Sequence, residues 1–199
     1  MQIAVVVFTV VIPKNRGLLT YRQKALSNLG FVPAKLVDVR GEDVPFWVEE
    51  LLKQNKRVIG LTGEDLFKEW CLANYGTKLK ILKRFLWEDP CALFGKPTLC
   101  LLGQENKTLE DLPQQLNVCI CAKYKLIAKK YLNFLKQQGY TFEKRYINGS
   151  VETSCSEGIA DLIIDIVYTG SSMKKYGLKV YDKIMQSDFV VIGREGEAT

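Results

Sequence analysis

Histidine is absent from this chain of 199 residues. Its absence excludes Ser-His-Asp and Cys-His catalysis, zinc sites with histidine ligands, and acid–base catalysis by an imidazole. The six cysteines contain no C-x-x-C pair, the spacing found in many zinc and redox sites. Cys119 and Cys121 are two positions apart, so they are expected on one face of a strand. We expect reduced, structural thiols in a cytoplasmic protein.

Long apolar runs are also missing. The apolar run at residues 3–12 is too short to cross a bilayer, and it lacks the basic segment and the small-residue cleavage site of a signal peptide. Its β-branched residues predict a buried first strand instead. We therefore expect neither a membrane anchor nor a secretion signal.

The composition is typical of a folded globular protein, because 47% of the residues are hydrophobic and 25% are charged. The net charge of +6 suits anionic ligands and does not require nucleic acid. Part of the basic excess forms one cluster, which is either a solvated face or a surface for a protein partner. This cluster comprises Lys123, Lys125, Lys129, Lys130, Lys136, Lys144 and Arg145.

Short apolar runs alternate with amphipathic helical stretches, a pattern that indicates an α/β fold. After the first strand, further strands are expected at residues 57–61, 79–86, 98–102, 117–121, 141–147, 162–167 and 189–192. The strand at 162–167 is almost entirely apolar, as expected for a strand buried on both faces. The turn-rich segment 88–97 predicts a hinge between two lobes. Asp43 is expected to cap a helix that begins at Val44.

The most informative stretch for chemistry is the end of that apolar strand together with the loop after it. Asp165 lies near the carboxyl end of the strand, where ligands bind in open α/β sheets. The loop contains Thr169, Gly170, Ser171 and Ser172 and then opens a helix. Its hydroxyl and N–H groups suit a phosphate monoester, and the carboxylate suits the hydroxyls of a ribose. Alternatively, this is an ordinary strand-to-helix turn in which Asp165 is satisfied locally.

Two junctions in the first half of the chain have a related composition. Lys14 and Arg16 follow the first strand in a loop with Gly17, and these two cations either bind a pyrophosphate group or are simply solvated. Gly63 and Asp65 lie at a strand-to-helix junction. That junction is either a helix start with acidic residues in its first turn or a ligand contact.

A further junction, at residues 149–152, is predicted to begin a short helix. Ser150 suits an anion at such a helix start. Glu152 suits either a sugar hydroxyl, because an ionised carboxylate accepts hydrogen bonds, or a metal ion held through water.

Taken together, these motifs resemble the ATP phosphoribosyltransferase family, which catalyses the first step of histidine biosynthesis. The carboxyl-terminal match is specific: residues 149–152, 158–163 and 165–170 follow the family's "GSVE", "GLAD-I" and "D-V-x-TG" elements in order and spacing. Weaker matches are found at residues 13–16 ("PKGR"), 43–49 ("DVP-x-YVE"), 60–66 ("GI-x-G-x-D-x-L") and 122–124 ("ATKYP"). The resemblance extends over residues 1–193.

The chain departs from the family pattern at several positions. Asn15 stands where the family usually has glycine, Ser172 replaces a usual threonine, and Lys125 replaces a usual proline. Residues 154–155 are Ser-Cys where the family has an alanine-proline pair. Ser172 keeps the hydroxyl that phosphate binding needs. Asn15 lacks the conformational freedom of glycine, so it affects the backbone geometry of the first loop and with it the proposed pyrophosphate site.

The resemblance implies an α/β protein of two lobes, similar to type II periplasmic-binding proteins, with the active site in the cleft between the lobes. Residues 1–92 with 181–199 are expected to form lobe I, and residues 93–180 to form lobe II with the phosphate loop. A chain that stops here resembles the short form of the family, without an additional regulatory domain. It is therefore expected as a homodimer within a hetero-oligomer that contains a regulatory subunit resembling histidyl-tRNA synthetase.

The implied reaction joins N1 of the adenine of ATP to C1′ of phosphoribosyl pyrophosphate and releases pyrophosphate, with Mg²⁺ bound mainly through substrate and water. Adenine N1 carries a free lone pair, so a chain without histidine can catalyse this reaction. The resemblance places the carboxylates of Asp165 and Glu152 at the ribose. It assigns the other contacts to Thr169, Gly170, Ser171 and Ser172 (5′-phosphate), Lys14 and Arg16 (pyrophosphate), and Gly63 and Asp65 (nucleotide).

Folds with two lobes also serve as binding modules, and a fold alone does not specify a function. The alternatives are a non-catalytic module for a small anion or a nucleotide, and a weakly active relative of the enzyme. A solute receptor needs a secretion or lipid-anchor signal, and a sensor of gene regulation needs a DNA-binding element. We expect neither in this chain, and we expect neither a membrane nor a nucleic acid as its partner.

Overall fold

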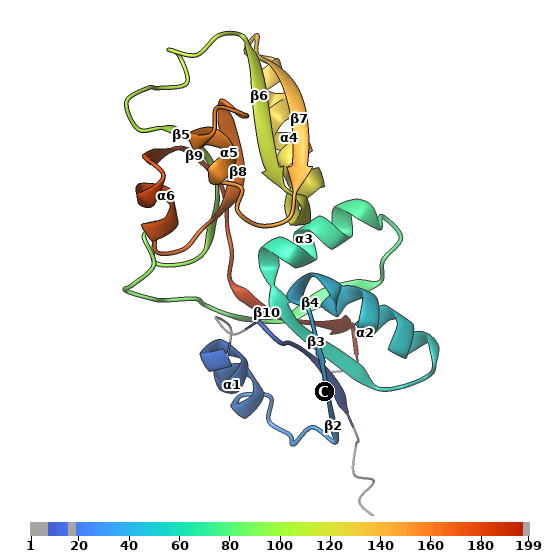
Figure 1. Cartoon of the computed structure of the whole chain (residues 1–199). Coiled ribbons are helices and arrows are strands. Elements are labelled where there is room, and N and C mark those ends of the chain that lie inside the picture. Colours follow the sequence, from blue (N-terminus) through green and yellow to red (C-terminus); the bar gives the residue numbers. More distant parts are fainter. Residues whose placement is uncertain (1–7, 16–18, 197–199) are drawn as a thin grey trace, which may run out of the picture. The chain divides into compact units, whose positions relative to one another are not determined.

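The computed structural model describes residues 8–15 and 19–196, and it divides the chain into two compact units. Unit 1 comprises residues 1–86 and 188–199, and unit 2 comprises residues 87–187. Each unit contains one five-stranded sheet and several helices (Figure 1). The expected α/β class is confirmed.

The unit boundaries differ from those expected for the two lobes, which were 1–92 with 181–199 and 93–180. Residues 181–187 belong to unit 2 because strand β9 (Leu178–Gln186) pairs with β5 (Thr98–Gln104). The sequence analysis did not anticipate β9. Its side chains are mostly half-buried or exposed and lack a regular apolar alternation.

Unit 1 is built around a mixed sheet with the strand order β2-β1-β3-β10-β4. Strand β1 is parallel to β2 and β3, whereas β10 runs antiparallel to β3 and β4. The strands are β1 (Thr9–Pro13), β2 (Lys35–Val39), β3 (Val58–Gly63), β4 (Leu79–Phe85) and β10 (Phe189–Arg194). The helices are α1 (Leu19–Ser27), the short 3₁₀ helix η2 (Gly41–Asp43), α2 (Val44–Lys53) and α3 (Glu64–Ala73).

The core of unit 1 lies between β3 and α2. All six residues of β3 are buried, and α2 turns Val44, Val48 and Leu52 toward the sheet at a spacing of four residues. Asp43 precedes α2, but its side chain makes no capping hydrogen bond, so the predicted cap is wrong. Pro45 occupies the first turn, where a missing N–H costs nothing.

Unit 2 has the strand order β7-β6-β8-β5-β9. Strand β6 is parallel to both β7 and β8, and β5 runs antiparallel to β8 and β9. The remaining strands are β6 (Gln115–Cys121), β7 (Thr141–Ile147) and β8 (Leu162–Val167). The helices are η3 (Ala122–Tyr124), α4 (Lys125–Lys136), α5 (Thr153–Ser156) and α6 (Ser171–Lys175). Among the helices described in the two units, none has the length and apolar character needed to cross a membrane.

The parallel strands of unit 2 determine which loops meet. Parallel strands have their carboxyl ends at the same edge of a sheet, so the segments after β7, β6 and β8 leave from one edge (Figure 1). These segments are residues 148–152, 122–124 and 168–172. Strand β8 is fixed in the middle of the sheet by Leu162, Ile163 and Ile164, none of which is exposed to solvent.

Several local predictions need correction. The short helix expected to begin at residue 149 begins at Thr153, because Gly149 and Ser150 both have positive φ angles of 74° and 49°. Strand β2 was not expected, since three of its five side chains are exposed. Of the expected first strand at residues 3–12, β1 contains residues 9–12, and residues 3–7 lie outside the described residues.

We predict that Gly60→Ala destabilises unit 1. A Cβ at this central position of β3 would lie 2.6 Å from Val44 Cγ1 and 2.6 Å from Val48 Cγ2, both in the packed core. Urea unfolding should show a free energy of unfolding lower by about 2 kcal/mol. The matched control is Gly76→Ala, because a Cβ there meets no atom within 4 Å and should change stability by less than about 0.5 kcal/mol. Equal stability of the two variants would contradict this packing.

Candidate functional site

Asp165 lies at the carboxyl end of β8, beside the end of β6. Ile120 pairs with Ile164 in the parallel register, so the next residues along the two strands, Cys121 and Asp165, are neighbours. The half-buried Asp165 carboxylate accepts a hydrogen bond from the Ile166 N–H at Oδ1 (2.7 Å). Part of its hydrogen-bonding capacity is thus satisfied within the sheet.

The Asp165 carboxyl is also shifted toward neutral pH. Burial raises its pKa to about 6, and the nearby Glu152 carboxylate acts in the same direction. The hydrogen bond from the Ile166 N–H and the positive charge of Lys123 oppose this rise. At pH 7 the group is therefore mostly ionised, but the fold holds its negative charge at a cost.

The loop after β8 places hydroxyl groups close to this carboxylate. Gly170 adopts a left-handed conformation (φ 75°) and immediately precedes α6. The Thr169 hydroxyl donates to Ser171 Oγ (3.0 Å), whereas the Ser172 hydroxyl donates to Glu152 Oε1 (2.5 Å). All three hydroxyl side chains are exposed. The structure therefore brings together Asp165, Glu152 and the loop at one edge of unit 2.

Residues 87–97 pack against the loop that follows β8 and support it. The Leu93 N–H donates to the Tyr168 carbonyl (2.7 Å), and the Tyr168 hydroxyl is hydrogen-bonded to Asp89. The Trp87 ring packs edge-on against Tyr168 with ring centres 6.0 Å apart. A Cβ on Gly170 would lie 3.1 Å from Leu93 Cδ2. Residues 88–97, expected to be a hinge, are therefore part of unit 2 and hold the loop in place.

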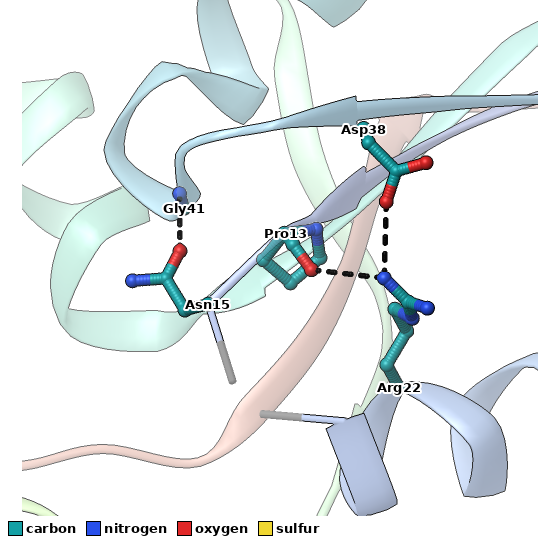
Figure 2. A network of polar contacts seen from close by, with 5 residues as sticks. All are labelled: Pro13, Asn15, Arg22, Asp38 and Gly41. Atoms are coloured by element: carbon teal, nitrogen blue, oxygen red, sulfur yellow. Dashed lines mark hydrogen bonds and ion pairs between the residues drawn. The ribbon is translucent and has the colours of Figure 1, made fainter. Parts of the chain in front are cut away.

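The first candidate loop lies at the edge of unit 1. Lys14 and Asn15 directly follow β1 and are exposed, while Arg16 and Gly17 lie outside the described residues. The Lys14 N–H donates to the Val39 carbonyl (2.8 Å). Asn15, the departure from the family's glycine, accepts a hydrogen bond at Oδ1 from the Gly41 N–H at 3.3 Å (Figure 2). The asparagine therefore fastens the loop to the start of η2.

A neighbouring cation anchors the same segment from α1. Arg22 Nη1 donates to Asp38 Oδ1 (3.0 Å) and to the Pro13 carbonyl (3.4 Å), as Figure 2 shows. This contact joins the end of β1 to β2. Arg22 therefore has a structural role at the end of β1. The sequence analysis did not identify this residue.

Gly63 and Asp65 occupy the end of β3 and the first turn of α3. Both are buried, and Asp65 is only 6% exposed. Because β1 and β3 are parallel, the two residues share the carboxyl edge of the sheet with Lys14. The adjacent Glu64 is tied down by an ion pair with Arg84 and by its own N–H, which donates to the Asp188 carbonyl (2.8 Å).

Two α/β units with this strand order, one of which has a hydroxyl-rich loop beside a carboxylate, define the class of two-lobed α/β proteins that includes periplasmic binding proteins. Solved structures agree. The chain matches the aliphatic sulphonate binding protein SsuA from Escherichia coli with a TM-score of 0.61 at 15% identity, over 96% of this chain and 66% of that one. It matches a chain of the ATP phosphoribosyl transferase (HisG:HisZ) complex from Thermotoga maritima with a TM-score of 0.67 at 20% identity, over 94% and 87%.

Sequence comparison identifies the family. The model of the HisG family, ATP phosphoribosyltransferase, matches residues 40–199. The ATP phosphoribosyltransferase of Lachnospira eligens is 33% identical over 142 residues, which is 71% of this chain and 57% of that protein. The chain belongs to the ATP phosphoribosyltransferase family, as its motifs indicated. It spans little more than half the length of this relative.

We predict that Asp165→Asn stabilises the protein at neutral pH by about 1–2 kcal/mol, because it removes a carboxylate that burial disfavours. The folded-state pKa of about 6 lies above the value of about 3.9 in an unfolded chain. The gain should therefore be complete above about pH 7 and should shrink as the pH falls toward 4, where the carboxyl is protonated in the folded protein and about half protonated in the unfolded chain. Urea unfolding of both proteins at pH 7.5 and pH 4 measures it.

The control for this prediction is Asp111→Asn. Hydrogen bonds from the Thr108 N–H and hydroxyl lower the pKa of Asp111, so the pH dependence has the opposite sign. Asp111 contributes stability at neutral pH, and that contribution is lost as the pH falls through its lowered pKa. A loss of stability for Asp165→Asn at pH 7.5 would mean that the carboxylate is stabilising, contrary to its burial.

Proposed function

We propose that this chain is a catalytic ATP phosphoribosyltransferase, which transfers phosphoribosyl from phosphoribosyl pyrophosphate to N1 of ATP in the first step of L-histidine biosynthesis. The observation that carries the proposal is the edge of unit 2, where the half-buried Asp165 carboxylate lies beside the exposed hydroxyls of residues 169–172. Family membership over residues 40–199 supports the same reaction.

The ribose and its 5′-phosphate are proposed to bind at this edge. Asp165 accepts hydrogen bonds from the ribose diol, and its negative charge favours the positive charge that develops at C1′ as pyrophosphate leaves. Thr169, Gly170, Ser171 and Ser172 bind the 5′-phosphate through hydroxyls and through N–H groups that have no partner within a helix at its first turn. Glu152 supports the site through its hydrogen bond from Ser172.

The attacking atom needs no protein base, because adenine N1 already carries a free lone pair. Catalysis then depends on fixed charges that stabilise a highly charged leaving group. Lys14 and Arg16 are proposed to hold the pyrophosphate, and Gly63 and Asp65 to contact the nucleotide. Of these residues, Lys14 follows strand β1, and Gly63 and Asp65 lie at and just after the end of the parallel strand β3, all in unit 1.

Mg²⁺ is proposed as the cofactor, bound mainly through oxygen atoms of pyrophosphate, ribose and water. Within residues 8–15 and 19–196, no cluster of three or more His, Cys, Asp or Glu residues is arranged to hold a metal ion. The phosphate and hydroxyl oxygens of the substrates are the hard ligands that Mg²⁺ prefers. When bound, the ion would neutralise charge on the leaving pyrophosphate.

We propose that the chain works in the cytoplasm as a homodimer within a hetero-oligomer that includes a regulatory subunit resembling histidyl-tRNA synthetase. The structure from Thermotoga maritima that shares this fold is of a complex of two proteins, HisG and HisZ.

The proposal predicts that pyrophosphate is released only when ATP, phosphoribosyl pyrophosphate and Mg²⁺ are all present. The assay is run with and without a candidate regulatory subunit. Asp165→Ala should lower kcat/KM by about 10²- to 10³-fold, because it removes charge stabilisation at the reacting centre. Ser171→Ala should mainly raise KM for phosphoribosyl pyrophosphate.

The control variant is Ser156→Ala on α5, whose hydroxyl is exposed and donates only to a carbonyl within its own helix. It should retain the activity of the unaltered protein. Tight binding of both substrates without pyrophosphate release, with the regulatory subunit present, would instead support a non-catalytic binding module. Full activity of Asp165→Ala would remove Asp165 from the site.

A further inference from the structure

Tyr168 lies between strand β8 and the hydroxyl-rich loop at residues 169–172. Val167 pairs with Thr98 in the last pair between β8 and β5, so the sheet fixes the chain as far as Val167. The half-buried Tyr168 is the next residue, and contacts with residues 87–93 hold it from there on. The position of the loop therefore depends on how firmly Tyr168 is held.

Both the backbone and the side chain of Tyr168 are engaged. Its carbonyl accepts a hydrogen bond from the Leu93 N–H (2.7 Å). Its hydroxyl donates to Asp89 Oδ2 and accepts a hydrogen bond from Trp87 Nε1 at 3.4 Å. The buried Trp87 ring packs edge-on against the Tyr168 ring, with ring centres 6.0 Å apart. The side chain is thus held both at its hydroxyl and along its ring.

Asp89, the acceptor of the tyrosine hydroxyl, is itself fixed by the turn that contains it. Its Oδ1 accepts a hydrogen bond from the Cys91 N–H (2.8 Å), and its own N–H donates to the Gly95 carbonyl (2.9 Å). The hydrogen bonds from Tyr168 and Cys91 lower the pKa of Asp89, so the carboxylate is ionised at neutral pH. A hydroxyl binds an ionised carboxylate more strongly than it binds a neutral acceptor.

The loop beyond Tyr168 also rests on the same segment. Gly170 has a left-handed backbone, and a Cβ there would lie 3.1 Å from Leu93 Cδ2. Leu93 thus contacts the loop with its side chain and holds Tyr168 with its N–H. A phosphate group is bound well only when several donors face it in a fixed geometry. A displacement of Tyr168 would move the N–H and hydroxyl groups of residues 169–172 out of that geometry.

We propose that Tyr168 is a positioning residue, whose hydroxyl, held by Asp89 and Trp87, fixes residues 169–172 in the conformation that binds the 5′-phosphate of phosphoribosyl pyrophosphate. The link between Tyr168 and Asp89 stands on the contacts within unit 2, and its effect on the substrate rests on the proposed function. Tyr168 acts through the loop and not on the reacting atoms. Loss of its hydroxyl should therefore weaken binding of this substrate more than it slows the chemical step.

The first test measures amide hydrogen exchange by NMR in the ligand-free, full-length protein. The Leu93 N–H reports on Tyr168, because it donates to the Tyr168 carbonyl. Tyr168→Phe keeps the ring and removes the hydroxyl, so exchange at Leu93 should become about 3- to 10-fold faster. The Thr141 N–H donates to the Gln114 carbonyl at the same distance of 2.7 Å, and its exchange rate should not change.

Asp89→Ala removes the acceptor and leaves the tyrosine intact. Exchange at Leu93 should again become faster. The double variant of Asp89→Ala and Tyr168→Phe should exchange at Leu93 no more than about twofold faster than Asp89→Ala alone, because the hydroxyl acts through that carboxylate. Effects that multiply would overturn the proposal, since the two residues would then act independently.

The matched control is Tyr181→Phe, which removes a tyrosine hydroxyl elsewhere in the same unit. That hydroxyl donates to the Gln104 carbonyl (3.0 Å) and joins strands β9 and β5. The change should leave exchange at Leu93 as it is in the unaltered protein. Unchanged exchange at Leu93 in both single variants would overturn the proposal. An equal increase at Thr141 would also overturn it, because the loss of protection would then be general to unit 2.

The second test follows pyrophosphate release with the regulatory subunit present. Tyr168→Phe should raise KM for phosphoribosyl pyrophosphate about 3- to 10-fold, whereas kcat and KM for ATP should change by less than about twofold. Tyr181→Phe should match the unaltered protein. An equal rise in KM for both substrates, or no rise, would refute the effect on phosphate binding. If the unaltered protein releases no pyrophosphate, the proposed function fails, while the exchange rates still decide whether Asp89 and Tyr168 hold the loop.

Discussion

The parallel pairing of β6 with both β7 and β8 is the constraint on which the site of unit 2 depends. It brings the segments at residues 122–124, 148–152 and 168–172 to one edge, although they are far apart in the sequence. The pairing is itself held by side chains of β8 that have no exposed surface. Because these side chains are consecutive, they lie on both faces of the sheet, and close packing on both faces holds the strand in its register. The chemistry at the edge is thus positioned by the apolar core beneath it.

Asp165 shows what this positioning costs. Its carboxylate accepts a hydrogen bond from the Ile166 N–H, yet burial still raises its pKa to about 6. A polar residue kept at a buried strand end against its own solvation is typical of a functional site, where a local rule is broken and the surrounding structure compensates. The compensation here includes the Ile166 N–H and the positive charge of Lys123, as well as the hydrogen bond from the Leu93 N–H to the Tyr168 carbonyl beside the loop.

Much of unit 2 could be predicted from the sequence, because its signals are local. The apolar run of β8, the Gly170 turn and the hydroxyls after it are all visible within ten residues of each other. Strands β2 and β9 could not be predicted, since both lie at sheet edges and lack apolar alternation. The contact between Ser172 and Glu152 also could not be predicted, because it depends on which strands pair and joins residues 20 positions apart in the sequence. Likewise, the sequence shows Asn15 only as a departure from a family motif, and its structural role becomes visible only through the hydrogen bond that it accepts from the Gly41 N–H.

Asp165 offers a physical reason why the proposed site does not need a histidine. A histidine titrates near pH 6.5 and is the usual side chain that changes charge close to neutrality. In this chain, burial brings a carboxyl into the same range, but with a charge of opposite sign. A negative charge suits a ribosyl centre that becomes positive as pyrophosphate leaves, whereas an imidazolium would oppose it. A reaction whose nucleophile already carries a lone pair needs such a fixed charge more than it needs a proton acceptor. A sheet edge with one shifted carboxylate and a loop of hydroxyls therefore matches what the proposed reaction requires at the ribose.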